Sequence, residues 1–334
     1  MLSIGVIGYG YWGPNVVRNF CAVDGARVLS VCDTNPHSID RAKTQYHHLD
    51  FCHDYRDITA SPEINAVAVV TPVSTHFEIS KSALENGKHL FVEKPFTRTV
   101  GEAEDLIALA SKNNLQIMVD HTFLFTGAVR KIKELIDKNT LGNLYYYDSI
   151  RVNLGLFQHD VNVIWDLAPH DLSIMDYVIK RKPIAVAANG AEHFGSGLED
   201  VAYVTVYFED NMIAHLDVNW MSPVKIRITL IGGEKKMLVW DDAEVDEKIK
   251  VYDKGVNVQT KEGIYKLLVD YRSGDAWVPR LDRTEALKLE TQYFIDCVSE
   301  GKTPINDGHA GLRVIKMLEA ASKSIKNKGK LIEL

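Results

Sequence analysis

Residues 1–14, Met-Leu-Ser-Ile-Gly-Val-Ile-Gly-Tyr-Gly-Tyr-Trp-Gly-Pro, pass from a short apolar run directly into the pattern Gly8-x-Gly10-x-x-Gly13. The next apolar run ends in Asp33, 20 residues after Gly13. Gly8 suits a tight turn out of a strand, Gly10 leaves room for a pyrophosphate, and Gly13 lets a helix pack close to the strand. The N-terminus of that helix directs its free N–H groups toward the phosphates. The stretch therefore predicts a dinucleotide-binding strand–turn–helix.

Asp33 bears on the choice of dinucleotide. Its carboxylate can accept hydrogen bonds from the adenosine ribose hydroxyls and would repel a 2′-phosphate. No arginine follows it immediately, since Thr34-Asn-Pro36 comes next. We therefore expect NAD in preference to NADP. The alternative is a glycine-rich turn in an ordinary α/β unit. That turn would explain Gly8, but it would not explain why a strand, three spaced glycines, a helix and Asp33 occur together.

Composition narrows the class of protein. The 334 residues suit about two domains. The net charge of -7, without a basic block, argues against nucleic acid as a partner. No apolar stretch approaches the roughly 20 residues of a membrane span, and no signal-peptide pattern precedes the first strand. The cysteines lack CxxC spacing, so we expect reduced thiols in a cytoplasmic protein and no metal site; they are Cys21, Cys32, Cys52 and Cys297.

The N-terminal part alternates short, Val- and Ile-rich strands with helical patterns, which predicts a doubly wound parallel sheet of the Rossmann type. The expected strands are 3–7, 27–33, 66–70, 88–92 and 117–121. The expected helices are 13–23, 36–46, 74–86 and 100–114.

The pattern changes after residue 122, where strands follow one another with short links such as Met221-Ser-Pro223. This predicts an α+β domain with a large, mostly antiparallel open sheet. We expect an NAD-binding domain over 1–122 and a substrate-binding and oligomerisation domain over 123–334, with the C-terminal helix packing back on the first. The strands are 144–153, 184–191, 200–208, 212–219 and 225–231, and the helices are 126–138, 168–180, 283–300 and 309–326.

The strand at 201–208 is apolar on both faces, since Tyr203 and Tyr207 alternate with Val204 and Val206. Helices can cover only one face of such a sheet. We therefore expect the other face to meet a second copy, giving a homodimer or homotetramer. The alternative is a solvent-exposed face that tolerates aromatic residues and threonines.

Two clusters are candidates for catalysis. Glu93-Lys94-Pro95 follows a predicted buried strand, at the sheet edge where ligands of α/β proteins bind. Asp166 and His170 are four residues apart, so they share a face if they lie on a helix, and near its N-terminus the dipole favours a neutral imidazole. Alternatively, Lys94 is a surface lysine, Asp166 only a helix N-cap and His170 a structural residue.

The order of these motifs resembles the Gfo/Idh/MocA family of oxidoreductases. Besides the glycine pattern, Glu93-Lys94-Pro95 and Asp166-x-x-x-His170, the chain has Thr71-Pro72-x-x-x-His76, Gly301-Lys-x-Pro304 and Asp307-Gly308. The resemblance implies an NAD(P)-dependent dehydrogenase acting on CH–OH groups. In that role Lys94 positions the substrate hydroxyl, His170 takes its proton, and Asp166 orients the substrate or His170. The implied cofactor contacts are Gly8, Gly10, Tyr11, Trp12, Gly13, Asp33, Thr71, Pro72, His76, Glu93, Lys94 and Pro95.

The stretch from Gln158 to His170 further resembles enzymes that oxidise the 3-hydroxyl of UDP-N-acetylhexosamines or their uronic acids. It has Val161-Asn-Val-Ile164 where many members of the family carry a glycine-rich run, which weakens the analogy to inositol dehydrogenases. Arg151 and Asn153, at a strand end, are candidate substrate contacts or ordinary strand residues. A dehydrogenase of a free cyclitol or sugar and a non-catalytic NAD-binding sensor remain as alternatives.

Overall fold

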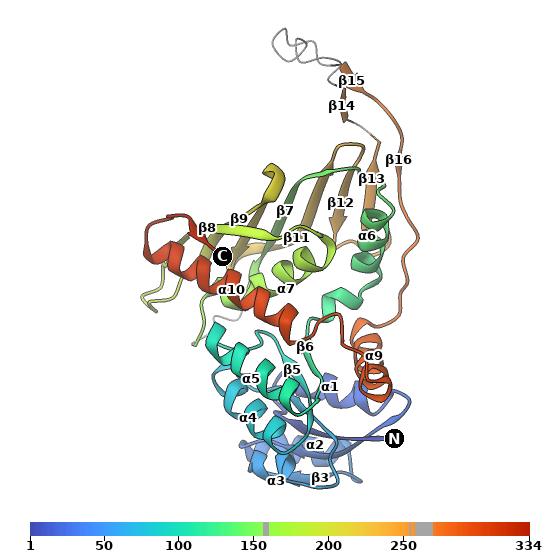
Figure 1. Ribbon diagram of the computed structural model, residues 1–334, viewed down its shortest axis with the longest axis vertical. Coiled ribbons are helices and arrows are strands. Elements are labelled where there is room, and N and C mark those ends of the chain that lie inside the picture. Colours follow the sequence, from blue (N-terminus) through green and yellow to red (C-terminus); the bar gives the residue numbers. More distant parts are fainter. Residues whose placement is uncertain (156–159, 254, 258–269) are drawn as a thin grey trace. The chain divides into compact units, whose positions relative to one another are not determined.

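The computed structural model describes residues 1–155, 160–253, 255–257 and 270–334, which form two compact units (Figure 1). The N-terminal unit comprises residues 1–126 and 284–319, and the C-terminal unit comprises residues 127–283 and 320–334. The division falls inside helix α10 (Gly308–Lys326), whose first part belongs to the N-terminal unit. The functional boundary at residue 122 stays a prediction.

The N-terminal unit is built on a six-stranded parallel sheet with the order β3-β2-β1-β4-β5-β6. Every residue of β4 is buried, because helices cover both faces of such a sheet. The expected Rossmann sheet is confirmed. Its strands are β1 (Leu2–Ile7), β2 (Ala26–Cys32), β3 (Asp50–Cys52), β4 (Ala66–Val69), β5 (His89–Glu93) and β6 (Ile117–Asp120).

Helices α2 and α5 of this unit begin after residues whose side chains cap them. The Asn35 side chain accepts a hydrogen bond from the backbone N–H of His37, and that of Thr99 from Glu102. Strand β3 and helix α3 were not expected, because each is too short to show a hydrophobic period. The helices are α1 (Gly13–Phe20), α2 (Pro36–Gln45), α3 (Tyr55–Thr59), α4 (Val73–Glu85), α5 (Val100–Lys112), the 3₁₀ turn η1 (Thr122–Phe125) and α9 (Ala286–Glu300).

The C-terminal unit contains a nine-stranded sheet with the order β16-β13-β12-β11-β7-β10-β9-β8-β17. Its strands pair antiparallel except for β10 with β7, which confirms the mostly antiparallel prediction. The strands are β7 (Leu144–Leu154), β8 (Pro183–Ala191), β9 (Val201–Phe208), β10 (Ile213–Asn219), β11 (Met221–Gly233), β12 (Met237–Asp241), β13 (Ile249–Tyr252), β16 (Ala276–Trp277) and β17 (Ile332–Glu333). Strands β14 (Gly255–Asn257) and β15 (Asp270–Arg272) form a separate pair.

One expected connection is wrong. The residues Met221-Ser-Pro223 do not form a turn between two paired strands but lie within β11, next to an irregularity in its pairing with β7. A proline is tolerated at such a bulge because it has no N–H to donate. Strands β10 and β11 are thus not neighbours, since β7 lies between them.

The helices of the C-terminal unit are α6 (Gly127–Asp137), α7 (Val163–Val178) and the 3₁₀ turn η2 (Glu209–Asn211). Helix α7 packs against β7, β9 and β10 (Figure 1). On β9, Val204 and Val206 are buried, whereas Tyr203 and Tyr207 on the other face are 46% and 37% exposed. Within the described ranges, no helix combines the length and apolar character that crossing a membrane requires.

Candidate functional site

The glycine loop after β1 has the tight geometry that its sequence predicts. Gly8 has a φ of +102°, and a Cβ there would lie 2.3 Å from the Val70 carbonyl oxygen. A Cβ on Gly13 would lie 2.4 Å from the carbonyl oxygen of Gly8, so α1 can begin this close only without a side chain. A Cβ on Gly10 would meet no atom within 4 Å. The loop therefore leaves open space at Gly10, where a pyrophosphate fits.

Asp33 is tied to this loop. Its Oδ2 accepts a hydrogen bond from the Tyr9 backbone N–H at 2.6 Å, and its Oδ1 accepts one from Asn35 at 2.8 Å. Each carboxylate oxygen can accept a second hydrogen bond, as ribose hydroxyls require. Arg41 donates to the carbonyl of Gly10 at 2.9 Å and lies over the Tyr9 ring. Asp33 and Arg41 together hold the loop from its α2 side.

His76 joins two of the predicted motifs. Its Nδ1 lies 2.9 Å from the Pro95 carbonyl oxygen, and its Nε2 lies 2.8 Å from that of Thr71. Burial lowers the pKa of this fully buried imidazole, and the hydrogen bonds with the two carbonyls oppose that effect. The ring fastens the loop after β4 to the loop after β5.

Glu93 and Lys94 lie at the carboxyl edge of the sheet, where the Lys94–Pro95 peptide bond is cis. Glu93 pairs in register with Asp120, the last residue of β6. Removal from water, and then the Asp120 carboxylate, raise the pKa of Glu93 well above its usual value. Burial, and then the Lys94 charge, lower the pKa of His121 to about 3. This edge therefore combines Lys94 with a protonated glutamate and a neutral histidine.

Two acidic residues near this edge were not predicted from the sequence. They are Asp120, at the end of β6, and Glu290, on α9. Asp120 is 2% exposed and Glu290 is fully buried. Signals for both were present. Asp120 lies at the end of the predicted strand 117–121, much as Glu93 directly follows the predicted strand 88–92, and Glu290 occupies the same buried helical stripe as Leu287 and Phe294.

In the C-terminal unit, α7 carries Asp166 and His170 one turn apart on the same side. The Asp166 Oδ2 accepts a hydrogen bond from the Trp220 indole at 3.0 Å, which fixes the orientation of the carboxylate. Trp220 follows β10, is 1% exposed, and was not anticipated.

The start of α7 corrects three expectations, of which the first is the boundary itself, since the helix begins at Val163 and not at residue 168. Asn162 is the N-cap, because its side chain accepts from the backbone N–H of Trp165 at 3.2 Å, so the reading of Asp166 as the cap is wrong. Pro169 lies inside the helix, where it removes the hydrogen bond to the carbonyl four residues earlier. His170 lies beyond the first turn, so the helix dipole acts on it only weakly.

Arg151 is engaged with α7. Its Nε donates to Asp171 Oδ2 at 2.6 Å and its Nη2 donates to Asp171 Oδ1 at 3.1 Å, while Ser149 Oγ donates to the same Oδ1 at 2.8 Å. Arg151 and Asp171 are 3% and 1% exposed. The pair fastens α7 to β7 beside His170. Asn153 is half-buried further along β7, and the predicted substrate stretch is described only from residue 160, with Gln158 outside the described residues.

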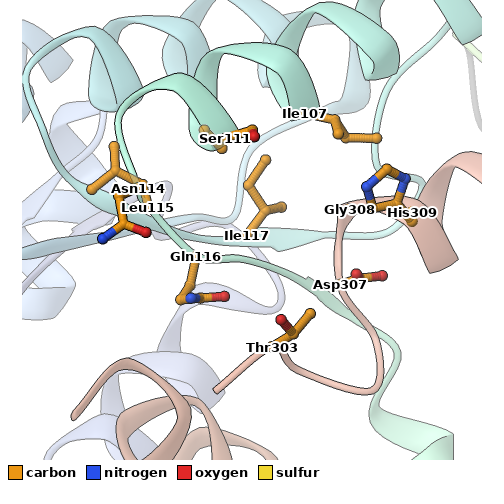
Figure 2. Close-up of a pocket in the computed structure, with 11 residues that line it drawn as sticks. Ile107, Ser111, Asn114, Leu115, Gln116, Ile117, Thr303, Asp307, Gly308 and His309 are labelled. Carbon is orange, nitrogen blue, oxygen red and sulfur yellow. The ribbon is translucent and has the colours of Figure 1, made fainter. Parts of the chain in front are cut away.

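A cavity of about 240 Å³ lies elsewhere in the N-terminal unit (Figure 2). It is lined by α5, the first residue of β6 and the start of α10, with the polar side chains Ser111, Gln116, Thr303, Asp307 and His309. Ligands of open α/β sheets bind at the carboxyl ends of strands, and this cavity is at the amino end of β6. It contains none of the predicted site residues.

Comparison with known proteins identifies the family of both domains. Residues 2–121 match the family described as "Oxidoreductase family, NAD-binding Rossmann fold", and residues 129–238 match the GFO/IDH/MocA C-terminal domain. The chain is 26% identical to the scyllo-inositol 2-dehydrogenase (NAD(+)) of Bacillus subtilis, over 91% of this chain and 87% of the relative. It is also 26% identical to the UDP-N-acetylglucosamine 3-dehydrogenase of Acidithiobacillus ferrooxidans, over 94% of each.

Solved structures share the fold. The structure of that Acidithiobacillus ferrooxidans enzyme superposes with a TM-score of 0.82 at 22% identity, covering 98% of each chain. An oxidoreductase of Agrobacterium radiobacter, solved in complex with NAD+, L-tartaric acid and magnesium, gives a TM-score of 0.82 at 16% identity, covering 99% of this chain and 98% of the other. With both of its domains matched, the chain belongs to the Gfo/Idh/MocA family and is an oxidoreductase with an NAD-binding Rossmann domain.

Proposed function

We propose that the protein is an NAD-dependent dehydrogenase that oxidises the 3-hydroxyl of a UDP-N-acetylhexosamine or its uronic acid. The observation that carries the proposal is the face of α7 that bears Asp166 and His170 one turn apart, with the Asp166 carboxylate held by Trp220. A carboxylate held beside a histidine is the arrangement expected of an oriented proton acceptor. The similarity to the UDP-N-acetylglucosamine 3-dehydrogenase over 94% of both chains supports this substrate class.

Each residue has a proposed role. NAD supplies the hydride acceptor when bound. Lys94 donates a hydrogen bond to the substrate hydroxyl and positions it, His170 takes its proton, and Asp166 orients the substrate or His170. Gly8, Gly10 and Gly13 form the phosphate loop, with Tyr11, Trp12, Thr71, Pro72, Glu93 and Pro95 beside the cofactor. His76 contributes by holding the two loops that it bridges.

The α7 start supports the sugar-nucleotide branch over the inositol branch. Asn162 caps the helix, and Val163 and Ile164 are fully buried in its first turn. A glycine-rich run could not supply that cap and that packing. Arg151 would act on substrate only through Asp171 and α7, whereas half-buried Asn153 remains a proposed direct contact. The similarity to scyllo-inositol 2-dehydrogenase keeps a free cyclitol as the second candidate.

A substrate panel tests the proposal. The full-length protein is incubated with NAD and, separately, UDP-N-acetylhexosamines, their uronic acids, inositols and free aldoses, and NADH absorbance is followed. We expect the highest kcat/KM with a UDP-sugar. A higher value with an inositol would move the protein to the cyclitol branch, and the absence of NADH with the whole panel would contradict catalysis of this kind.

Cofactor choice is tested separately by titration calorimetry. We expect NADH to bind more tightly than NADPH, because a 2′-phosphate would face the Asp33 carboxylate. Asp33→Ala should bring the Kd values of NADH and NADPH closer together, since it removes both the hydrogen bonds to the ribose of NADH and the repulsion of the NADPH 2′-phosphate. A preference of the wild type for NADPH would overturn the assignment of Asp33. A cytoplasmic location goes with the proposal, because all four cysteines are free thiols.

A further inference from the structure

The Trp12 side chain links the glycine loop to the far strand of the N-terminal sheet. Its Nε1–H donates a hydrogen bond to Asp120 Oδ2 at 3.1 Å. Trp12 lies in the loop after β1, and Asp120 ends β6, while β4 and β5 lie between these strands. Neighbouring strands are about 4.8 Å apart, so this contact bridges the carboxyl edge past the ends of β4 and β5.

Asp120 is the centre of a group of three acids, in which Asp120 and Glu290 are buried and Glu93 is half-buried. Glu93 is its register partner on β5, and Glu290 lies on α9. The Glu290 Oε1 accepts from Asn306 Nδ2 at 3.0 Å, and the same amide donates to the Val119 carbonyl at 2.7 Å, which ties α9 to β6.

Asp120 acts on the pKa of both neighbouring glutamates. Burial, and then Asp120, raise the pKa values of both Glu93 and Glu290 well above the usual range, so both glutamates keep their protons. Asp120 accepts hydrogen bonds from Trp12 and from the Thr122 hydroxyl, as a carboxylate does. Burial, and then Lys94, lower the pKa of the neighbouring His121 to about 3. One carboxylate therefore faces the indole N–H.

We propose that Asp120 is a positioning residue: it holds the indole of Trp12, and an indole held beside the nicotinamide ring of a bound cofactor would make the site prefer oxidised over reduced cofactor. The inference rests on the proposed NAD-dependent function and extends it. The oxidised ring is a cation, which an indole face attracts, whereas the reduced ring is neutral. A hydrogen bond to a carboxylate fixes the indole plane and adds negative charge behind it.

Calorimetric binding of NAD+, NADH and ADP-ribose to the full-length protein tests this. Trp12→Leu removes the aromatic face and Asp120→Asn removes only the charge. Each should raise the Kd of NAD+ about tenfold, the scale of a partly desolvated cation–π contact, and change the Kd of NADH and of ADP-ribose less than about threefold. The matched controls are Glu290→Gln, which replaces a protonated acid by a neutral amide, and Trp277→Phe on β16. Neither should change the ratio of the NAD+ and NADH Kd values by more than about twofold.

The outcomes separate this inference from the function. Equal weakening of all three ligands by Asp120→Asn would show a purely structural acid and overturn the inference. A wild-type protein that binds NAD+ but oxidises no sugar would contradict the function, while the Kd ratios would still decide the role of Asp120. A wild-type protein that does not bind NAD+ would overturn both.

Discussion

The carboxyl edge of the N-terminal sheet and the inner face of the C-terminal sheet both bury acids, but in opposite ways. At the first, Glu93, Asp120 and Glu290 crowd together, and two of them retain protons. At the second, Asp171 is matched by the Arg151 guanidinium. A matched pair fixes one arrangement, whereas crowded acids respond to pH and to nearby charge. The C-terminal pair is thus suited to hold a helix, and the N-terminal group to meet a ligand whose charge changes.

The largest expected effect comes from breaking the matched pair. Asp171→Ala leaves the Arg151 guanidinium buried without its carboxylate, and should lower the free energy of unfolding by about 3–5 kcal/mol. Asp246→Ala is the control, since it breaks a pair with Arg283 whose side chains are 70% and 79% exposed. That loss should be about 0–1 kcal/mol. Urea unfolding measures both, and equal losses would show that Asp171 does not fasten α7.

The second prediction concerns the proposed catalytic residues of the two units. Lys94→Ala and His170→Ala should each lower kcat at least about a hundredfold, or about 2.7 kcal/mol in activation free energy, because each removes a positioned group from proton transfer. Both variants should still bind NADH, since the glycine loop is intact. Exposed Lys112→Ala and His47→Ala are the controls and should react at the wild-type rate. Wild-type turnover by His170→Ala with a confirmed substrate would contradict its role as the base.

How much of this structure the sequence predicts depends on how far apart in the chain the interacting residues lie. The Rossmann sheet was predictable because the hydrophobic pattern of each βα unit lies in a short, continuous stretch of sequence. The short strand β3 and the short helix α3 were not predicted. In the C-terminal sheet β7, β8, β9, β10 and β11 were predicted, but β12, β13, β16 and β17 were not, and neither was the strand order. Strand β7 precedes α7 in the chain and yet separates β10 from β11, and no local pattern encodes that insertion.

The site shows the same division. Glu93 and Lys94 stand out because polar residues follow a buried strand, and Asp166 and His170 because of their helical spacing. The pairing of Arg151 with Asp171, and of Trp12 with Asp120, joins residues 20 and 108 positions apart. Such contacts depend on the packed structure, so the sequence left Arg151 open between a substrate contact and an ordinary strand residue, and it assigned no role to Asp171 or Asp120.

The third prediction tests the crowded acids through pH. The folded protein keeps the Glu290 proton above the ordinary carboxyl pKa of 4.5, whereas the unfolded chain releases it there. Above that pH the folded state binds more protons, so stability falls as pH rises, by at most about 1.4 kcal/mol per pH unit for one proton. Glu290→Gln should flatten the dependence of the urea midpoint on pH, and exposed Glu63→Gln should leave it unchanged. An unaltered slope in Glu290→Gln would show that this acid is ionised in the fold.

The smallest expected effect concerns the outer face of the C-terminal sheet, which we propose as the contact between two copies of the chain. Tyr203, Tyr207 and Ile213 are 46%, 37% and 39% exposed there, whereas the alternate β9 residues on the inner face are buried. An isologous sheet-to-sheet contact would cover them and give a dimer, or a tetramer by repetition. Light scattering should give a mass at least twice the 37.5 kDa of the chain.

Tyr207→Asp puts a charge on this face and should raise the dissociation constant of the dimer about tenfold, or about 1.4 kcal/mol. Phe194→Asp, at an exposed aromatic residue outside the strands, is the control and should leave the mass unchanged. A wild-type chain that is monomeric at micromolar concentration would show that this face is exposed to solvent despite its aromatic residues.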